Sequence, residues 1–352
     1  MTARKPNIWG ADTAGLQFSF IRRVWIVVQE HSATGSRLQA LVALSPSEQV
    51  TLPWNIDAIV SELREARGRS KRVIAAGNRK APLPNPKKLQ QVIVGVYASL
   101  FPRHAGAIDH SDEGLAYFIG NTLNQALHVL LEQVRREHAF IDETRTEHDT
   151  AFSPEQIVSE FASSLPQLYE TLESDIRAAY DGDPSAKSTE EVLLSFPGIR
   201  AIIHHRVAHA LHTLGAPVVA RIVAELAHSQ TGIDIHPGAK IGGSFFIDHG
   251  TGVVIGETAI IGERVRLYQA VTLGAKRFSI DEGGALIKGQ PRHPIVEDDV
   301  VIYAGATILG RITIGRGSTI GGNIWLTRSV PPRSNIVQAQ ARSETFDNGA
   351  GI

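Results

Sequence analysis

The feature that most constrains the fold is a row of aliphatic residues that recurs every six positions between residues 296 and 330. Neither an α-helix, with about 3.6 residues per turn, nor a flat strand, with a period of two, requires a period of six. A coil of three short strands does, because each strand then turns one large and one small side chain inward. One coil cannot bury that face alone, so the coils must stack into a β-helix. The two rows are Val296, Ile302, Ile308, Ile314, Ile320 and Leu326, and, four residues behind them, Val300, Ala306, Ile312, Ser318, Ile324 and Val330.

The same period extends upstream to about residue 231, with one disturbance and one interruption. Around residues 250–252 the position of the large residue shifts by two. The pattern stops after Gly274 and resumes at Pro294, so we predict that residues 275–292 form a loop that projects from the coil. A loop of this length in a compact repeat is usually functional or disordered. The upstream members are Ile235, Ile241 and Ile247 before the shift, and Ile255, Ile261, Leu267 and Leu273 after it.

The chain before the repeat has a helical pattern. Apolar residues recur at helical spacing in 90–101, 114–138, 155–180 and 199–214. Ser153 and Ser188 are followed three residues later by Gln156 and Glu191, the spacing of a capping box. We therefore predict an α+β fold in which an N-terminal α-helical domain precedes a left-handed parallel β-helix of hexapeptide repeats. The predicted divisions are an extension at 1–55, helices at 56–230, the β-helix at 231–330 and a flexible tail at 331–352.

Composition excludes several classes of function. The chain has 35 basic and 36 acidic residues, and this balance gives no attraction to nucleic acid or to an anionic membrane. It has no cysteine, and therefore no disulfide, thiolate metal site or cysteine nucleophile, which fits a reducing compartment. No apolar run reaches the ~20 residues of a membrane span, and the first residues lack the apolar region of a signal peptide. We expect a cytoplasmic protein.

Three histidines lie in or beside the repeat, at His236, His249 and His293. An imidazole, with an ordinary pKa of ~6.5, can take a proton from a hydroxyl near neutral pH. It works better when a carboxylate holds its other ring nitrogen. Asp234 precedes His249 by fifteen residues, close to one coil of about eighteen, which would place them on adjacent rungs. From spacing alone, catalysis and turn packing both remain open.

Other polar clusters have simpler explanations. His205 and His209 are four residues apart, as in helical zinc pairs, but no third ligand stands at a recognisable spacing. We therefore expect a structural role for them and no metal site. A basic cluster in the long loop is either a solvated surface or a contact for an anionic ligand. Its members are Lys276, Arg277, Lys288 and Arg292.

Taken together, the motifs resemble those of the serine O-acetyltransferases, a family of hexapeptide-repeat acyltransferases. The resemblance spans roughly residues 181–330 and the C-terminal tail. It implies transfer of an acetyl group from acetyl-CoA to the hydroxyl of L-serine, giving O-acetyl-L-serine in the first step of cysteine biosynthesis. The motifs are Asp183-Pro184, TGIDIHP at 231–237, IDHGTG at 247–252, VIGET at 254–258, VTLG at 271–274, RHP at 292–294 and AGATILG at 304–310.

The resemblance also implies residue roles. His249 would be the general base, oriented by Asp234. An aspartate suits an ammonium group, and an arginine suits a carboxylate through its two-pronged donors. His293 and a backbone N–H are candidate donors to the tetrahedral oxyanion, so His293 counts as catalytic as well. The residues placed around the serine amino and carboxylate groups are Asp183, Asp248, Arg292 and His293.

Ligands and partners follow from the same resemblance. Acetyl-CoA would be a co-substrate, with no permanently bound cofactor, and Gly274 and Ala304 would leave room for its pantetheine arm. The family forms homotrimers, or dimers of trimers, with active sites between neighbouring coils. Ile352 ends a Gly-rich acidic tail of the kind that inserts into the active site of O-acetylserine sulfhydrylase.

Three other functions compete with this one. The nearest is another hexapeptide acyltransferase that acts on a sugar or an amine. A γ-type carbonic anhydrase would hold zinc with three histidines from two subunits, but the sequence shows no histidine pair at the required spacing. A non-catalytic scaffold would use only the tail to bind the sulfhydrylase.

Overall fold

The structure is a computed structural model that describes residues 55–69, 82–108, 111–142, 152–277 and 280–338. The chain divides into two compact units, Met1–Gly77 and Asn78–Ile352. In the first unit the described residues form helix α1 (Ile56–Arg69). Nearly all of the predicted N-terminal extension, and the end of the predicted tail, lie outside the described residues. The domain boundaries drawn from the sequence remain predictions.

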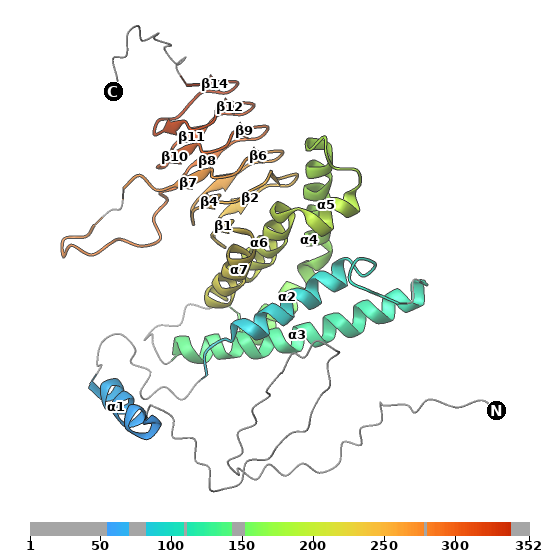
Figure 1. The fold of residues 1–352 in the computed structure, drawn as a ribbon, viewed down its shortest axis with the longest axis vertical. Helices are drawn as coiled ribbons and strands as arrows, with labels where there is room; N and C mark the ends of the chain where they lie inside the picture. The colour runs from blue at the N-terminus through green and yellow to red at the C-terminus, as the bar shows by residue number, and fades with distance from the viewer. Residues whose placement is uncertain (1–54, 70–81, 109–110, 143–151, 278–279, 339–352) are drawn as a thin grey trace, which may run out of the picture. The chain divides into compact units, whose positions relative to one another are not determined.

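Helices occupy the described start of the second unit, and short strands follow them (Figure 1). The four segments with helical periodicity fall on α2, α3, α4 and α6. None of the helices in the described ranges combines the length and hydrophobicity that a membrane crossing needs. The bounds are α2 (Pro86–Leu100), α3 (Asp112–Asp142), α4 (Pro154–Gly182), α5 (Thr189–Ser195), α6 (Pro197–Thr213) and α7 (Pro217–Thr231).

The two predicted capping boxes differ. At Ser153 the box is complete, because its side chain accepts the N–H of Gln156 at 3.2 Å and the Gln156 side chain accepts the N–H of Ser153 at 2.8 Å. At Ser188 the prediction is half wrong. Its side chain accepts the N–H of Glu191 at 3.1 Å, but the Glu191 carboxylate accepts the N–H of Lys187 instead, at 2.8 Å. The carboxylate therefore satisfies the amide one residue before the cap.

The repeat forms three parallel sheets, the faces of a left-handed β-helix. The strand direction turns at a corner between one sheet and the next, so each coil has three corners. The first sheet contains β1 (Asp234–Ile235), β4 (Val254–Ile255), β7 (Thr272–Gly274), β10 (Thr307–Leu309) and β13 (Trp325–Leu326). The second contains β2 (Lys240–Ile241), β5 (Ile260–Ile261), β8 (Ile295–Val296) and β11 (Thr313–Ile314). The third contains β3 (Phe246–Ile247), β6 (Arg266–Leu267), β9 (Val301–Ile302), β12 (Thr319–Ile320) and β14 (Asn335–Ile336).

The six-residue rows form the interior of the coil, as predicted. Most members from Ile235 to Ile320 are fully or almost fully buried. Burying one such side chain contributes about 1.5–3 kcal/mol, so the stack accounts for much of the stability of this region. Ser318 is a polar member of the row. Its hydroxyl accepts the N–H of Ser334 at 3.0 Å and donates to the carbonyl of Pro331 at 3.2 Å, which satisfies it inside the core.

The predicted register shift is an enlarged corner. Asp234 pairs with Val254, twenty residues on, whereas Val254 pairs with Thr272, eighteen residues on. The two additional residues lie in the turn 248–253, between β3 and β4. Gly250, with φ +87°, is required there because a β-carbon would collide with the side chain of Ile233. The coil therefore swells at the turn that carries His249.

An ion pair joins the helices to the first coil. Asp175 on α4 is fully buried, and its carboxylate lies 3.0 Å from Nη2 of Arg206 on α6. Arg206 also donates to the carbonyls of Ile241 and Gly242, and the N–H of Phe245 donates to Asp175 at 2.8 Å. These bonds hold α4 and α6 against the start of the β-helix.

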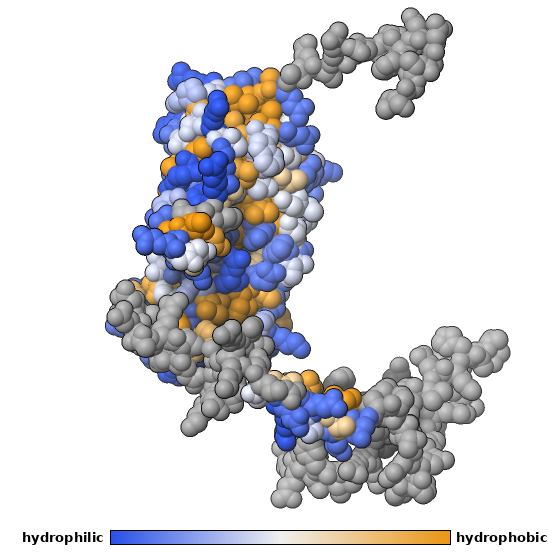
Figure 2. All heavy atoms as spheres, turned by 90° about the vertical axis from the view of Figure 1, so that its left-hand side faces the viewer, coloured by the Kyte–Doolittle hydropathy of each residue, from blue (hydrophilic) through white to orange (hydrophobic). Residues whose placement is uncertain are grey.

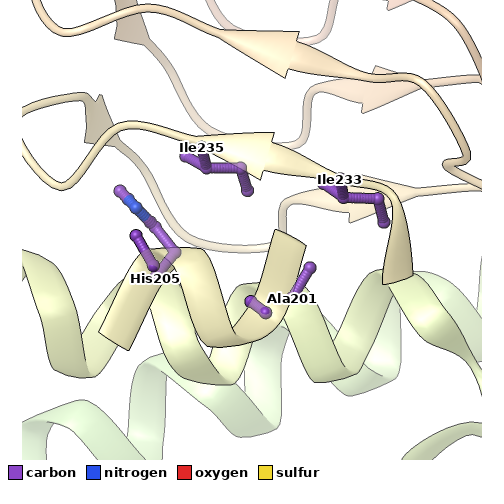
Figure 3. A pocket seen from close by; sticks show the side chains of 6 residues that line it. Ala201, His205, Ile233 and Ile235 are labelled. Atoms are coloured by element: carbon purple, nitrogen blue, oxygen red, sulfur yellow. The ribbon is translucent and has the colours of Figure 1, made fainter. Parts of the chain in front are cut away.

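A narrow crevice lies where α6 faces β1. Figure 3 shows Ala201 and His205 of α6 opposite Ile233 and Ile235. Burial lowers the pKa of His205 well below its ordinary value, so the ring is neutral. The crevice has no space for a water molecule. We therefore assign His205 to packing.

Candidate active site

The structure separates the predicted site residues between two corners of the coil. The corner from the third sheet to the first carries Asp248 and His249, and we call it the His249 corner (residues 248–253, 268–271 and 303–306). The corner from the first sheet to the second carries Arg292 and His293, and we call it the Arg292 corner (residues 236–239, 256–259 and 292–294). Asp234 lies on β1, between the two.

His249 projects from the enlarged turn into solvent. Its backbone is left-handed, with φ +56°, and its side chain is 73% exposed. Its Nε2 lies 3.8 Å from Oδ1 of Asp248. The turn runs beside β1, where the N–H of Asp234 donates to the carbonyl of Val253 at 2.9 Å. Among the described residues no hydrogen bond joins Asp234 to the His249 ring, so orientation by Asp234 remains a prediction.

Asp183 and Asp248 lie close to His249. Asp248 is 7% exposed, and its Oδ2 accepts a hydrogen bond from Nη2 of Arg266 at 2.6 Å. Asp183 follows the end of α4, and its carboxylate accepts the N–H of Ser185 at 2.8 Å. That bond lowers the pKa of Asp183, and the positive charge of Arg266 lowers it further. The helical region and the coil thus each supply one carboxylate to this corner.

The sequence patterns missed Arg266 as a site residue. It precedes the buried Leu267 in β6 and pairs with Phe246 in the strand below. Beside it the rings of Tyr268 and Tyr303 stack, with centroids 5.0 Å apart and planes 10° apart. The only signal in the sequence was a charged residue at an outward position of the repeat, and outward positions are usually solvated.

At the Arg292 corner, Thr258 organises the motif that ends the long loop. Its hydroxyl oxygen accepts the N–H groups of Arg292 at 2.9 Å and of His293 at 3.1 Å. The N–H of Thr258 donates to Nδ1 of His293 at 3.0 Å. Because Nδ1 is an acceptor, the neutral His293 ring carries its proton on Nε2. Burial and the neighbouring Arg292 lower the pKa of His293, which favours this neutral form.

Two further contacts define the Arg292 corner. The Arg292 guanidinium is 2.5 Å from the carboxylate of Glu257, with which it forms an ion pair. Arg311, which the sequence patterns also missed, donates to the carbonyls of Thr258 at 2.6 Å and His293 at 3.0 Å. This corner therefore presents a positive charge and an N–H donor.

The two residues predicted to contact CoA lie at different corners. Gly274 ends β7, where the chain leaves for the long loop, and Ala304 lies in the His249 corner after β9. A β-carbon on Gly274 would come within 2.8 Å of the Leu309 side chain. Among the described residues, no group of three His, Cys, Asp or Glu side chains is placed to hold a metal ion.

Two proteins related to this chain in sequence are both serine acetyltransferases. The chain is 54% identical over 325 residues to the plasmid serine acetyltransferase of Synechococcus elongatus, which covers 88% of this chain and all of that protein. It is 48% identical over 166 residues to the serine acetyltransferase of Mycobacterium tuberculosis, which covers 47% of this chain and 69% of that protein. No protein-family model matches the chain.

Solved structures resemble it as well. Serine acetyltransferase 1 of Entamoeba histolytica in complex with L-cysteine matches with a TM-score of 0.63 and 34% identity, covering 80% of this chain and 97% of that one. Serine acetyltransferase isoform 3 of the same organism, in complex with cysteine, matches with a TM-score of 0.61 and 33% identity, covering 82% and 95%.

Proposed function

The chain belongs to the serine acetyltransferase family, and we propose that His249 is the general base with which it transfers an acetyl group from acetyl-CoA to the hydroxyl of L-serine. The products are O-acetyl-L-serine and CoA, in the first step of cysteine biosynthesis. The observation that carries the base assignment is the placement of His249, an exposed imidazole 3.8 Å from a buried carboxylate.

The proposed reaction begins when the His249 ring takes the proton of the serine hydroxyl. The serine oxygen then attacks the thioester carbonyl, and the C–O bond forms as the carbonyl oxygen becomes an oxyanion. When the intermediate collapses, the C–S bond breaks. The CoA sulfur leaves with the proton returned by the imidazolium. Asp234, one rung away, would stabilise the imidazolium in between.

Serine recognition divides between the two corners. Asp183 and Asp248 would bind the ammonium group, and Arg292 would bind the carboxylate with the charge-assisted geometry that suits these groups. The Nε2–H of His293 would donate to the substrate oxygen or to the oxyanion, since Thr258 already occupies Nδ1. Each corner thus supplies half of what serine requires.

This division supports a homotrimer, or a dimer of trimers, in which the His249 corner of one subunit meets the Arg292 corner of the next. Exposed apolar surface also supports an oligomer, because such patches mark sites of contact between proteins. On the first sheet, Val254 is 38% exposed and Trp325 is 71% exposed. Figure 2 shows apolar surface in a band along the β-helix, between hydrophilic margins.

Acetyl-CoA is the co-substrate of the family, and its arm would pass between subunits. Gly274 and Ala304 lie at the two ends of strands of the first sheet, and their small size would leave room there for a pantetheine chain. The thioester would then enter beside His249. Replacing Ala304 with a larger residue should raise the KM for acetyl-CoA and leave the KM for serine unchanged.

L-Cysteine should compete with serine at the same site, because it differs from serine only in carrying sulfur in place of the hydroxyl oxygen. Cysteine is bound in the related Entamoeba structures. Titrating cysteine at several serine concentrations tests this. Inhibition that serine does not relieve would place cysteine elsewhere.

The C-terminal Ile352 lies outside the described residues, and its role rests on the tail sequence. We propose that it inserts into the active site of O-acetylserine sulfhydrylase, with its carboxylate captured by backbone donors. Deleting Ile352 should abolish binding of the sulfhydrylase in a titration, with acetyl transfer unaffected. Unchanged binding would refute the assignment.

One assay tests the function as a whole. CoA release should require both acetyl-CoA and L-serine, and sugars or simple amines should not replace serine. His249→Ala should lower kcat by about 10²–10⁴-fold, the range for loss of a general base. His128→Ala, which removes an exposed histidine on α3, is the matched control. Near-normal turnover in the His249 variant would remove it as the base.

A further inference from the structure

Arg266 joins the two carboxylate segments of the His249 corner. Its Nη2 donates to Oδ2 of Asp248 at 2.6 Å, and its Nη1 donates to the carbonyl of Gly182 at 2.8 Å. Gly182 is the last residue of α4, and Asp183 follows it directly. One guanidinium therefore holds a segment of the helical region and a segment of the coil together.

The surroundings of Arg266 restrict its orientation. Its guanidinium carbon lies 4.9 Å from the centroid of the Phe246 ring and 4.6 Å from that of Tyr268. Tyr268 in turn stacks on Tyr303. A planar guanidinium stacks well on aromatic faces, whereas an ammonium group does not. The Arg266 Nε is buried without a partner among the described residues, so both of its described hydrogen bonds run through Nη1 and Nη2.

These contacts fix the orientation of Asp248. Its side chain is 10% exposed, and a buried carboxylate is costly unless a partner compensates its charge. Arg266 is that partner, and it donates to Oδ2 of Asp248. The other oxygen, Oδ1, is the one that lies 3.8 Å from the His249 ring. The carboxylate is therefore held with one oxygen toward the site.

The same side chain fixes the start of the Asp183 segment. A β-carbon at Gly182 would lie 3.0 Å from the Phe246 ring and 3.6 Å from Nη1 of Arg266. The absence of a side chain at Gly182 thus allows the end of α4 to approach Phe246 and Arg266 closely. Arg266 also lowers the pKa of Asp183, after the larger effect of the Ser185 N–H.

We propose that Arg266 is a positioning residue that holds Asp183 and Asp248 as a preformed receptor for the ammonium group of L-serine. It acts through these carboxylates and does not touch the substrate. The inference rests on the proposed function, in which both aspartates bind serine. It predicts that Arg266 controls affinity for acceptors that carry an amino group and leaves the binding of acetyl-CoA unaffected.

The test compares Arg266→Met and Arg266→Lys by steady-state kinetics. In the Met variant the KM for L-serine should rise about 10- to 100-fold, the range for losing hydrogen bonds to charged groups. The KM for acetyl-CoA should be unchanged, and kcat should stay within about threefold, since uniform substrate binding is what is lost. The KM of the Lys variant for L-serine should be intermediate, because one ammonium group can donate to Asp248 but cannot at the same time hold the carbonyl of Gly182.

A second readout separates positioning from general damage. 3-Hydroxypropionate has the carboxylate and hydroxyl of serine but no amino group. Its inhibition constant against serine should change less than about threefold in both variants, because the carboxylates that Arg266 positions do not bind it. Equal weakening of serine and 3-hydroxypropionate, or an unchanged serine KM, would overturn the proposal. If the Met variant does not fold, the Lys variant carries the same comparison.

Two controls distinguish the possible failures. Arg264→Met removes an exposed arginine two residues away, paired with Asp299, and should leave the serine KM unchanged. Asp248→Asn tests the proposed function itself. If it does not raise the serine KM, the assignment of Asp248 as a serine ligand fails. If it does and Arg266→Met does not, the positioning role alone is wrong. In the Arg266→Met, Asp248→Asn double variant the two effects on the serine KM should be less than additive, because part of the effect of Arg266 passes through Asp248.

Discussion

The imidazole of His293 packs directly on the backbone of Gly256, so that a β-carbon on Gly256 would overlap the ring. Gly256 does not need a left-handed backbone, because its φ is not among the positive values in the described residues. The glycine is therefore required by the close approach of His293. The two residues belong to successive coils, so they come into contact only when the coils stack.

Gly256→Ala should displace the His293 ring and weaken its donation from Nε2. Removing one oxyanion donor costs about 10²–10³-fold in kcat, and a displaced donor should cost a large part of that. The measurement is kcat with L-serine, with circular dichroism to confirm the fold. Gly120→Ala is the control, because a β-carbon there meets nothing within 4 Å. Full activity in the Gly256 variant would exclude a catalytic role for His293.

Mixing two inactive variants tests whether sites form between subunits. His249→Ala and Arg292→Ala damage opposite corners, so mixed trimers contain some interfaces with two intact corners. Random mixing should restore about a quarter of the sites, because each partner is intact at the needed corner half the time. The mixed subunits are refolded together and assayed.

The control for this experiment uses two variants of one corner. His249→Ala mixed with Asp248→Asn should recover no activity beyond that of the Asp248 variant, since no interface regains an intact His249 corner. If the pair from opposite corners also fails to recover, although trimers form, each site lies within one subunit.

Removing one partner of the buried Asp175–Arg206 pair should destabilise the protein. Arg206→Met leaves a fully buried carboxylate without its charge partner, and such changes cost about 3–5 kcal/mol. Urea unfolding at pH 7.5 and one protein concentration measures this. Arg135→Met is the comparison, because both side chains of its pair with Glu155 are more than half exposed, and solvent screening should make its loss much smaller. Similar losses of unfolding free energy in both variants would contradict a stabilising role for the buried Asp175–Arg206 pair.

His236 should make stability depend on acid pH. Burial, together with the charge of Arg221, lowers its pKa in the folded protein to about 4 from the ordinary 6.5. As pH falls from 6.5 toward 4, the unfolded chain binds a proton that the folded protein does not, so stability is lost on acidification across that window. The half-exposed ring reduces the expected loss to about 1–2 kcal/mol.

His236→Asn tests this, because its amide oxygen can replace Nδ1 as acceptor for the Gly238 N–H without titrating. The variant should lose less stability than the natural protein between pH 7 and pH 4.5, measured by urea unfolding. Asp175, whose pKa burial raises to about 6, titrates in both proteins and cancels in the difference. Equal losses in the two proteins would show that His236 contributes nothing.

Features that repeat, or that involve residues close together in the chain, could be predicted from the sequence. The six-residue rows predicted the coil because burial in a stacked interior imposes that period on the chain itself. The cap at Ser153 was predictable because its partners lie three residues apart. The swelling at His249 was visible as a shift of two residues. The prediction of a capping box at Ser188 was half wrong, because the spacing does not decide whether the Glu191 carboxylate accepts the N–H of Ser188 or that of Lys187.

The site depended on contacts that spacing does not encode. Arg266 resembles any outward charged residue until the fold places Asp248 and the carbonyl of Gly182 within its reach. Arg311 likewise acquires its contacts from residues 18 and 53 positions away.

The sequence by itself therefore determined the β-helix, the helices before it and, through its motifs, the family to which the chain belongs. The tertiary structure decided that the motif residues divide between two corners of the coil, and which side chains hold them there. The physical reason is that burial acts on every repeat and leaves a period in the sequence. A corner is instead assembled from turns of successive coils, whose contacts appear only when the coils stack.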